Sequence, residues 1–482
     1  MEILHPGLYM LEVQGEVPVE GISTATGAFV GTAPRGKVGE AVLATSWTQF
    51  VKEYGGFDAN SYLAYAVKGF FENGGSRAYI VRTVHYNLGA KTSESASIML
   101  QDADIVPVNV MTIQAKSDGL WGNDISLVVE AGEGAGTYNI NVLYKGSQVE
   151  QYVSLTSETV ISVTATSAYI ECIKLQDTIP VPIVATNLTG GNDGLEAISD
   201  SDYLGIEEYK NGLYALDSYR INLVAIPGIT TSPVLQGVLT YVEGRGDCFA
   251  ILDTPMAQTI TGARTFVKAT ANLASEYAGI YYPWVIVPDP IGAGNNPLKT
   301  VAPSGHVMGA FARIDSSIGV WKAPAGLDAK LLGVVGLEYK MSDTEQGLLN
   351  PENINCIRSF DGQGIVIWGA RTLSIGKFKY VPAKRTILFI SDSLYTILQW
   401  AVFQPNNLAL WDALKANTEN FLSTMWAQGA LKGKTAKEAF FVKCDADLNT
   451  ADIVEAGYTY IDLGVALLKP SEFIIFRLTV MK

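Results

Sequence analysis

Histidine and cysteine are scarce in this chain of 482 residues, which contains only three histidines and four cysteines. The cysteines stand far apart, and none of them belongs to a CxxC pair: they are Cys172, Cys248, Cys356 and Cys444. Structural zinc sites and disulfide frameworks need several such residues at close spacing. We therefore predict no metal site, no cofactor and no disulfide, and expect all four thiols to be reduced.

Charge is scarce as well, because charged residues make up 17% of the chain, where about 25% is usual. The 34 basic and 48 acidic residues give a net charge of −14, without a basic arm or a long basic run. Binding to phosphates needs clustered Lys and Arg, so we predict no nucleic-acid partner. The large, weakly polar surface that remains favours extensive assembly.

Long apolar runs are absent, since no stretch reaches the roughly 18 apolar residues of a membrane-spanning helix. The first ten residues, MEILHPGLYM, also lack the basic start and the apolar core of a signal peptide. We expect a protein that is made in a cytoplasm and that does not insert directly into a membrane.

A phosphate-binding loop is suggested by GTAPRGKV at residues 31–38, where two glycines and a lysine have the spacing of that motif. The Ser or Thr that would bind Mg²⁺ after the lysine is replaced by Val38, and Pro34 removes one backbone donor. The residues that follow resemble a turn and a short strand, whereas the motif must open into a helix. We therefore predict a turn at a strand end, without a bound nucleotide.

Catalytic groups are hard to identify, because the only histidines are His5, His85 and His306 and no GxSxG elbow occurs. Asp289 follows a strand-like run, where α/β enzymes often keep a catalytic acid, but no nucleophile or base is identifiable beside it. Ser304 lies two residues before His306, which does not by itself make a triad. We predict no catalytic residue. A cytosolic α/β enzyme that uses Asp289, Ser304 and His306 remains the alternative.

The hydrophobic patterns predict a multidomain protein of mixed α/β class. Alternation at period two in the middle of the first half predicts antiparallel strands inserted into an α/β core. The expected parts are an extended N-terminal arm at 1–24, the first part of the α/β core at 25–87, an inserted antiparallel β domain at 88–195, the rest of the α/β core at 196–380, and a C-terminal helix–strand domain at 381–482.

Local signals predict individual elements within these parts. Ser46 is a plausible cap for a helix in SWTQFVKEYGG, and a second helix is expected in SYLAYAVKGFFENGG. Further helices are expected at 231–244 and 258–277. Strands are expected in INLVAIPG, CFAILDTP, YYPWVIVPDP, DISLVVE, TYNINVLYK, QVEQYVSL and TVISVTA.

Near the C-terminus, two apolar faces at helical spacing predict two helices, followed by three strands. The first face consists of Leu394, Ile397, Leu398, Ala401 and Val402, and the second of Trp411, Leu414, Thr418, Phe421, Leu422 and Met425. The strands are expected in AFFVKC, YTYIDLGVALL and EFIIFRLTV.

Several of these stretches, taken in this order over residues 20–86 and 195–480, resemble the contractile tail sheath proteins of bacteriophages. The same family is shared with R-type bacteriocins and related injection systems. The resemblance rests on VEGISTATGAFVGTAPRGKVGEAVLATSWTQF, YLAYAVKGFFENGGSRAYIVR, LYALDSYRINLVAIPG, RGDCFAILDTP, YYPWVIVPDP, APSGHVMGAFARIDSSIGVWKAPAG, LNPENINCIRSFDGQGIVIWGARTL, KRTILFISDSL, FQPNNLALW and AFFVKCDADLNT. Beyond GLWGND, the region 88–195 carries no such signature, and taken alone it could be a receptor-binding surface module.

The resemblance implies a structural subunit, not an enzyme. Such subunits form homo-oligomers, as stacked six-membered rings around an inner tail tube protein, and they contract to drive the tube through the target cell envelope for genome delivery. Baseplate and tail terminator proteins are the other implied partners. The implied location is the tail sheath of a virion that is assembled in the host cytoplasm. The sequence does not separate a phage from a bacteriocin or an injection system.

Exchanged strands are the links that the resemblance implies between subunits. The N-terminal arm has strand composition but no partner of its own, which suits a donor for β-augmentation. The C-terminal strand is a second candidate, since terminal strands must be paired or covered. The residues expected to exchange are Leu8, Tyr9, Met10, Leu11 and Val13 in the arm and Phe473, Ile474, Ile475, Phe476 and Leu478 at the C-terminus.

Contact with the inner tube is expected from the C-terminal domain. Lys432, Lys434 and Lys437 in LKGKTAKEA form the densest basic cluster of the acidic chain. We expect these lysines to face an acidic tube. A solvated loop without a partner explains the same cluster equally well.

Overall fold

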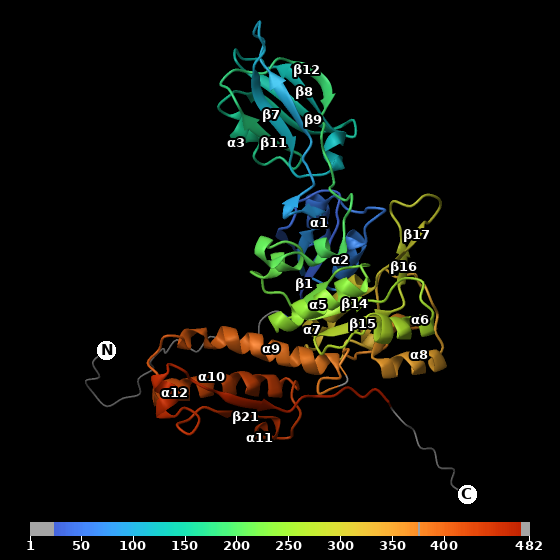
Figure 1. Ribbon diagram of the computed structural model, residues 1–482, viewed down its shortest axis with the longest axis vertical. Coiled ribbons are helices and arrows are strands. Elements are labelled where there is room, and N and C mark those ends of the chain that lie inside the picture. The colour runs from blue at the N-terminus through green and yellow to red at the C-terminus, as the bar shows by residue number, and fades with distance from the viewer. Residues whose placement is uncertain (1–23, 375, 474–482) are drawn as a thin grey trace, which may run out of the picture. The chain divides into compact units, whose positions relative to one another are not determined.

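The computed structural model describes residues 24–374 and 376–473 of the chain (Figure 1). These residues form two compact units. The large unit contains Thr24–Leu388 together with residues 469–473, and the C-terminal unit contains Phe389–Leu468. The predicted mixed α/β class is confirmed, because both units combine helices with sheets. Within the described residues, no helix is both long and apolar enough to cross a bilayer.

A mostly parallel sheet of eight strands forms the centre of the large unit. Its order is β2-β3-β1-β13-β14-β15-β19-β20, and only β2 and β20, at the two edges, run antiparallel to their neighbours. The inner strands are short, nearly continuous apolar runs, as is usual for a sheet covered on both faces. The strands span Thr26–Gly31 (β1), Ala41–Ala44 (β2), Arg77–Arg82 (β3), Leu223–Ala225 (β13), Phe249–Asp253 (β14), Ala278–Tyr282 (β15), Ile354–Phe360 (β19) and Gly364–Ile367 (β20).

Two apolar clusters cover the two faces of this sheet. Successive residues of β1 alternate between them, because side chains of a strand point to opposite faces: Phe29 belongs to one cluster, and Ala28 and Val30 belong to the other. The first cluster includes residues of α1, α2 and α7, and the second includes residues of α5 and α6. These helices span Trp47–Tyr54 (α1), Leu63–Glu72 (α2), Ser232–Arg245 (α5), Ile260–Thr265 (α6) and Ser304–Ser317 (α7).

The helices α2 and α7 approach each other closely at glycines. A Cβ atom added to Gly305 would lie 2.1 Å from the carbonyl oxygen of Ala66, and one added to Gly309 would lie 2.5 Å from that of Phe70. Both contacts are with backbone, which cannot move aside as a side chain can. The two glycines therefore set the spacing of this helix pair.

The caps predicted for α1 are confirmed, since the Ser46 side chain accepts a hydrogen bond from the Gln49 N–H and Gly55 ends the helix in the left-handed region.

The prediction of a helix over 258–277 is partly wrong. After α6 the chain makes one wider helical turn, Phe266–Thr270, and then leaves helical geometry at Asn272, whose φ is 46°. The side chain of Gln236 holds this exit through the carbonyls of Ala271 and Asn272.

Smaller elements complete the large unit. The stretch YYPWVIVPDP is not one strand, because it divides at Pro283 into β15 and β16, which belong to different sheets. Apart from the two sheets and the short helix described below, the other α-helices and strands of this unit are Tyr86–Asn87 (β4), Ala90–Lys91 (β5), Asp200–Leu204 (α4), Val285–Pro288 (β16), Leu298–Val301 (β17), Gly336–Leu337 (β18) and Asp343–Leu349 (α8).

The antiparallel β structure predicted for the region 88–195 is confirmed, and it consists of two sheets that share one apolar core. One sheet has the order β10-β9-β8-β12 and the other the order β11-β7-β6. Their strands span Ser97–Gln101 (β6), Asn109–Ala115 (β7), Ile125–Ala131 (β8), Tyr138–Tyr144 (β9), Ser147–Leu155 (β10), Ile170–Lys174 (β11) and Ile183–Asn187 (β12).

The predicted strand TVISVTA is wrong, because its residues form the short helix α3, Val160–Thr164. Two threonines before the helix account for this difference. Thr156 and Thr159 exchange backbone-to-hydroxyl hydrogen bonds, and the Val160 N–H bonds to the Thr156 carbonyl, which bends the chain into a helical turn. Only Val160 and Thr164, four residues apart, then face the core.

The C-terminal unit consists of helices and one small sheet. The face predicted for α10 is confirmed, since all six of its residues are buried. The face predicted for α9 is wrong at its end, because α9 stops at Leu398 and Val402 is exposed. The elements span Val381–Leu398 (α9, shared with the large unit), Leu408–Ala427 (α10), Ala436–Ala439 (α11), Phe440–Lys443 (β21), Ala451–Glu455 (α12) and Asp462–Val465 (β22).

Candidate assembly sites

The N-terminal end of the described chain is fixed to the large unit by a buried ion pair. Arg385, in α9, donates a hydrogen bond from Nη2 to the carbonyl oxygen of Thr24 at 3.0 Å. The same guanidinium pairs with Asp315 of α7 at 2.5 Å, and the side chains are 3% and 1% exposed. It also lies over the ring of Phe311, 5.0 Å from the centroid. Thr24, the last residue of the predicted arm, is thereby fixed.

The C-terminal end of the described chain is fixed in a similar way by Arg371. Its Nε and Nη2 atoms donate to the two carboxylate oxygens of Glu472 at 2.7 and 2.6 Å. Its Nη1 atom donates to the Asn350 carbonyl at 2.6 Å. The backbone of Arg371 is held on both sides by the Asn355 side chain, at 2.7 Å each. This bidentate ion pair fixes both the position and the orientation of the chain at Glu472.

The charge state of Glu472 follows from this contact. Burial alone would raise the pKa of Glu472, but the hydrogen bonds and the positive charge of Arg371 outweigh it and hold the pKa below its ordinary value. The carboxylate is therefore ionised at neutral pH. The next residue, Phe473, is exposed.

The expected exchanging residues lie mostly outside the described residues. Phe473 is described, and the others are Leu8, Tyr9, Met10, Leu11, Val13, Ile474, Ile475, Phe476 and Leu478. Sequence reasoning did not find the buried arginines that fix both ends. The one available signal was the basic pair Lys384–Arg385 at the start of an otherwise apolar helix.

A two-stranded sheet lies in the C-terminal unit. The strands β21 and β22 pair antiparallel from Phe440 with Val465 to Lys443 with Asp462. Within the described residues, no third strand joins this sheet. A sheet of two strands is marginal alone, and its free N–H and C=O groups are a template for another strand. The arrangement is suited to accept strands from elsewhere.

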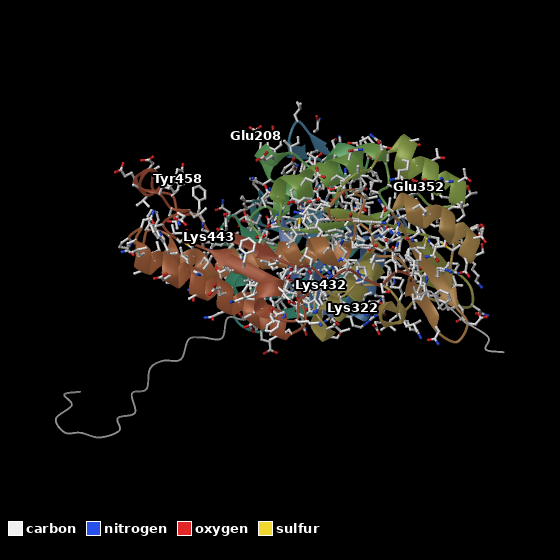
Figure 2. All side chains as sticks on the ribbon, turned by 90° about the horizontal axis from the view of Figure 1, so that it is seen from below. Glu208, Lys322, Glu352, Lys432, Lys443 and Tyr458 are labelled. Atoms are coloured by element: carbon white, nitrogen blue, oxygen red, sulfur yellow. The ribbon has the colours of Figure 1, made fainter. Side chains whose placement is uncertain are left out.

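Of the three lysines expected at the tube, Lys432 and Lys434 precede α11 and Lys437 lies within it. All three are exposed, and no ion pair joins them to any described residue. The backbone N–H of Lys434 bonds to the carboxylate of Glu438, which orders the turn between them. Figure 2 shows Lys432 at the surface of the protein. This geometry fits both the tube contact and the solvated loop.

The loop GTAPRGKV joins the core to the β region, and its turn after a strand is confirmed, since β1 ends at Gly31. Lys37 pairs with Glu40 at 2.9 Å. Arg35 donates to the last carbonyls of α1 and lies over the ring of Trp121 at 5.2 Å. The buried Arg82 donates to the Gly36 and Asp118 carbonyls at 2.8 and 2.9 Å. The polar groups of this loop thus bind neighbouring parts of the chain.

The candidate catalytic residues are not brought together. The Ser304 hydroxyl donates to Asp253 at 2.7 Å, and Asp289 accepts a hydrogen bond from Tyr65 at 2.6 Å. His306 is buried, and its Nδ1 atom has no hydrogen-bond partner. Among the described residues, no group of three or more His, Cys, Asp or Glu side chains could hold a metal ion.

Burial is the main cause of the pKa shifts of His306 and of Asp253, the partner of Ser304. It raises the pKa of Asp253 to about 6, although the Ser304 and Gly228 hydrogen bonds act in the opposite direction. It lowers the pKa of His306 to about 4, with a smaller contribution from Lys68. Asp253 ends β14, and its carboxylate accepts the N–H and the hydroxyl of Ser304, the first residue of α7. It thereby satisfies one of the free N–H groups at the start of that helix.

Comparison with known proteins extends this description. The family model for the phage tail sheath protein central domain matches residues 203–373, and that for the phage tail sheath C-terminal domain matches residues 376–481. Together the two models cover more than half of the chain. The tail sheath protein of Burkholderia phage BcepMu is 22% identical over 481 residues, which covers 96% of this chain and 94% of that protein.

Two solved structures share the fold. The anti-feeding prophage helical sheath in its contracted state matches with a TM-score of 0.62 at 21% identity, and 98% of each chain is covered. The sheath tail protein of Listeria innocua matches with a TM-score of 0.64 at 13% identity, over 93% of this chain and 96% of that one. The chain belongs to the phage tail sheath family and is a structural subunit of a contractile sheath.

Proposed function

We propose that copies of this chain stack as six-membered rings around an inner tail tube and are linked by exchanged strands. The observation that carries the proposal is the open β21–β22 sheet, which offers two edges and has no third strand among the described residues. The donors are the predicted strands at the two chain ends: Leu8, Tyr9, Met10, Leu11 and Val13, and Phe473, Ile474, Ile475, Phe476 and Leu478.

The two buried arginines support this arrangement. A donated arm can hold a neighbour only if its base is firmly attached to its own subunit. Arg385 fixes Thr24 at the base of the arm, and Arg371 fixes Glu472, directly before the proposed C-terminal donor strand. Each exchanged hydrogen bond contributes only ~0.5–1.5 kcal/mol net. Several bonds per arm, repeated in every subunit, keep the rings linked while the units move as rigid bodies.

The sheath contracts and drives the tube through the envelope of the target cell for genome delivery. The exposed cluster of Lys432, Lys434 and Lys437 faces the tube, which must then be acidic. No nucleotide is needed if the extended lattice is kinetically trapped and the contracted lattice buries more surface. The baseplate and a tail terminator bound the sheath at its ends. The region 88–195 lies on the outer surface.

The protein acts in this scheme as a structural component and not as an enzyme. The separation of Ser304, His306 and Asp289 into different contacts supports that view. Assembly takes place in the cytoplasm of the host. A sheath of an R-type bacteriocin or an injection system fits the same chain, and the anti-feeding prophage match favours keeping that second candidate.

Negative-stain electron microscopy over a concentration series tests the linkage. The full chain is expected to form rings or tubes that disappear when residues 1–20 are deleted. Deletion of residues 1–5 alone is the matched control, because it leaves the predicted strand intact. Rings or tubes that persist without residues 1–20 would contradict linkage through the arm. Compact particles of the full chain at every concentration would shift support to the enzyme alternative.

A further inference from the structure

The C-terminal unit exposes several large apolar side chains between α9 and the first residue of α10 and in the segment after α12. We call the group the aromatic patch, and it consists of Trp400, Val402, Phe403, Leu408, Tyr458 and Tyr460, all of which are exposed. Scattered apolar residues are common at surfaces, whereas apolar residues gathered on adjoining segments are typical of an interaction site. The patch lies entirely within the C-terminal unit.

The patch is held in place by polar contacts. The side chain of Asn406 donates to the Tyr458 carbonyl at 2.8 Å, which ties the α9–α10 loop to the segment after α12. The buried Trp411 donates from its indole nitrogen to the side-chain oxygen Oδ1 of Asn406 at 2.7 Å. Tyr458 and Tyr460 lie with their rings nearly parallel, 6.3 Å apart. Figure 2 shows Tyr458 projecting from the surface. The apolar groups are therefore presented by an ordered scaffold.

Phe403 stands out within this group. It is fully exposed, at 102%, and its φ is 68°, in the left-handed region. A bulky residue rarely adopts this geometry, which Gly or Asn would adopt with less strain. Within the described part of the chain, no packing offsets the strain or the exposure of the ring. Strain of this kind is typical of functional surfaces, where a contact made later compensates for it.

We propose that the aromatic patch is a docking surface for a second copy of this chain, in addition to the exchanged strands. Charge decides the choice of partner. Each copy carries a net charge of −14, so copies repel one another and meet best where charge is absent. The nineteen residues between Asp392 and Asp412 contain no charged side chain. Aromatic side chains that leave water are also the typical anchors of protein interfaces.

The exposed lysines near α11 form a charged surface, whereas residues 393–411 carry no charge, so the lysine cluster and the aromatic patch are separate surfaces. A charged cluster suits a partner of opposite charge, such as an acidic tube, whereas the aromatic patch suits an equally uncharged surface of another copy. The inference rests on the proposed assembly of copies into a sheath. It predicts that removal of one ring weakens assembly without weakening the fold of a single copy.

The test is the substitution Phe403→Gly in the full chain. Glycine removes the ring and also relieves the left-handed backbone, so the melting temperature of the unassembled protein should stay the same or rise. The critical concentration for assembly, measured by sedimentation and electron microscopy, should rise about tenfold or more, as for loss of an interface anchor. Leu88→Gly is the matched control, because Leu88 is 97% exposed with a φ of 50° but stands in a two-residue turn. It should assemble as the unchanged chain does.

Four other outcomes would overturn the inference. Equal assembly of Phe403→Gly and the unchanged chain would show that the patch is not an interface between copies. A melting temperature lowered by several degrees would show that Phe403 packs within its own chain. Normal assembly of copies combined with lost binding of tube protein would assign the patch to the tube. A full chain that never assembles would remove the proposed function as well, and so is distinguishable from the other three.

Discussion

Arg385 and Asp315 form an ion pair inside the large unit, 2.5 Å apart and with both side chains almost fully removed from solvent. The pair joins α9 to α7, and the same guanidinium holds the Thr24 carbonyl. A pair with such burial contributes little net stability compared with an apolar pair of the same size, but it is costly to break on one side only. Its role here is to orient the chain at Thr24, at the base of the arm.

Removal of one partner tests this view. Asp315→Ala leaves the Arg385 charge buried and unpaired, and should lower the free energy of unfolding by about 3–5 kcal/mol. The urea-unfolding midpoint measures the loss. Glu40→Ala is the control, because Glu40 pairs with Lys37 at an exposed site where the loss should not exceed about 1 kcal/mol. An equally small loss in Asp315→Ala would mean that water replaces the carboxylate. The double substitution Arg385→Met with Asp315→Leu should recover most of the stability.

The Glu472 carboxylate should make the anchoring of the C-terminal segment depend on pH. Its pKa is lower in the folded state than the ordinary value of 4.5, so the stability that it contributes is present above that value. It is lost as the pH falls through the lower, folded-state pKa. The melting temperature of the unchanged chain should therefore exceed that of Glu472→Gln at pH 7, and the two should converge in acid. A gap that stays constant down to about pH 3 would contradict the shift.

Asp253 should show the opposite dependence. Burial raises its pKa from 3.8 to about 6 in the folded state. Folding thus favours the protonated carboxyl, and this stabilising contribution is complete below the unfolded pKa and lost as the pH rises through 6. The unchanged chain should lose stability relative to Asp253→Asn between about pH 4 and pH 6. A relative gain over that range would show that the N–H groups of Gly228 and Ser304 outweigh burial.

The spacing of α2 and α7 can be tested with two glycines in different settings. Gly305→Ala places a methyl group 2.1 Å from the Ala66 carbonyl and should cost about 1–3 kcal/mol or more of stability through overpacking. Gly244→Ala is matched, since Gly244 is also helical but has no atom within 4 Å of its added Cβ. It should stabilise α5 by roughly 0.5–1 kcal/mol. Equal effects on the melting temperature would contradict the close packing.

Local signals in the sequence predicted local structure well where the signal was strong. Ser46 and the left-handed Gly55 delimit α1 because capping chemistry involves neighbouring residues only. The buried face of α10 is recognisable because its apolar spacing persists from Trp411 to Met425, about four helical turns. The strand-like composition of TVISVTA misled, since threonine hydroxyls that bond to the nearby backbone outweighed the preference of β-branched residues for strands.

The assembly features were less predictable because they depend on distant residues. Arg371 and Glu472 are 101 positions apart, and nothing in either segment indicates the other. The φ of Phe403 also cannot be read from its residue type, since phenylalanine is among the residues least expected in the left-handed region. The lysines near α11 were found because a basic cluster in an acidic chain is visible in the sequence itself.

The edge of β22 provides the sharpest test of strand exchange. Because the Ala466 N–H bonds to the Ala439 carbonyl, the alternation of an antiparallel ladder directs the N–H of Leu463 away from β21, to the open edge. Leu463→Pro therefore removes an edge donor without breaking the β21–β22 pair, and its ring also obstructs an added strand. Assembly should require at least about tenfold more protein, which corresponds to ~1.4 kcal/mol.

Leu463→Thr is the matched variant for that experiment, because it loses the same apolar side chain but keeps the edge N–H. It should assemble at nearly the concentration of the unchanged chain, and both variants should retain the helical circular dichroism of the parent. If the two variants assemble equally well, β22 is not the accepting edge and the donated strand must pair with β21. If both fail to assemble while remaining folded, the Leu463 side chain is needed at the contact, and the backbone hydrogen bond is not the deciding interaction.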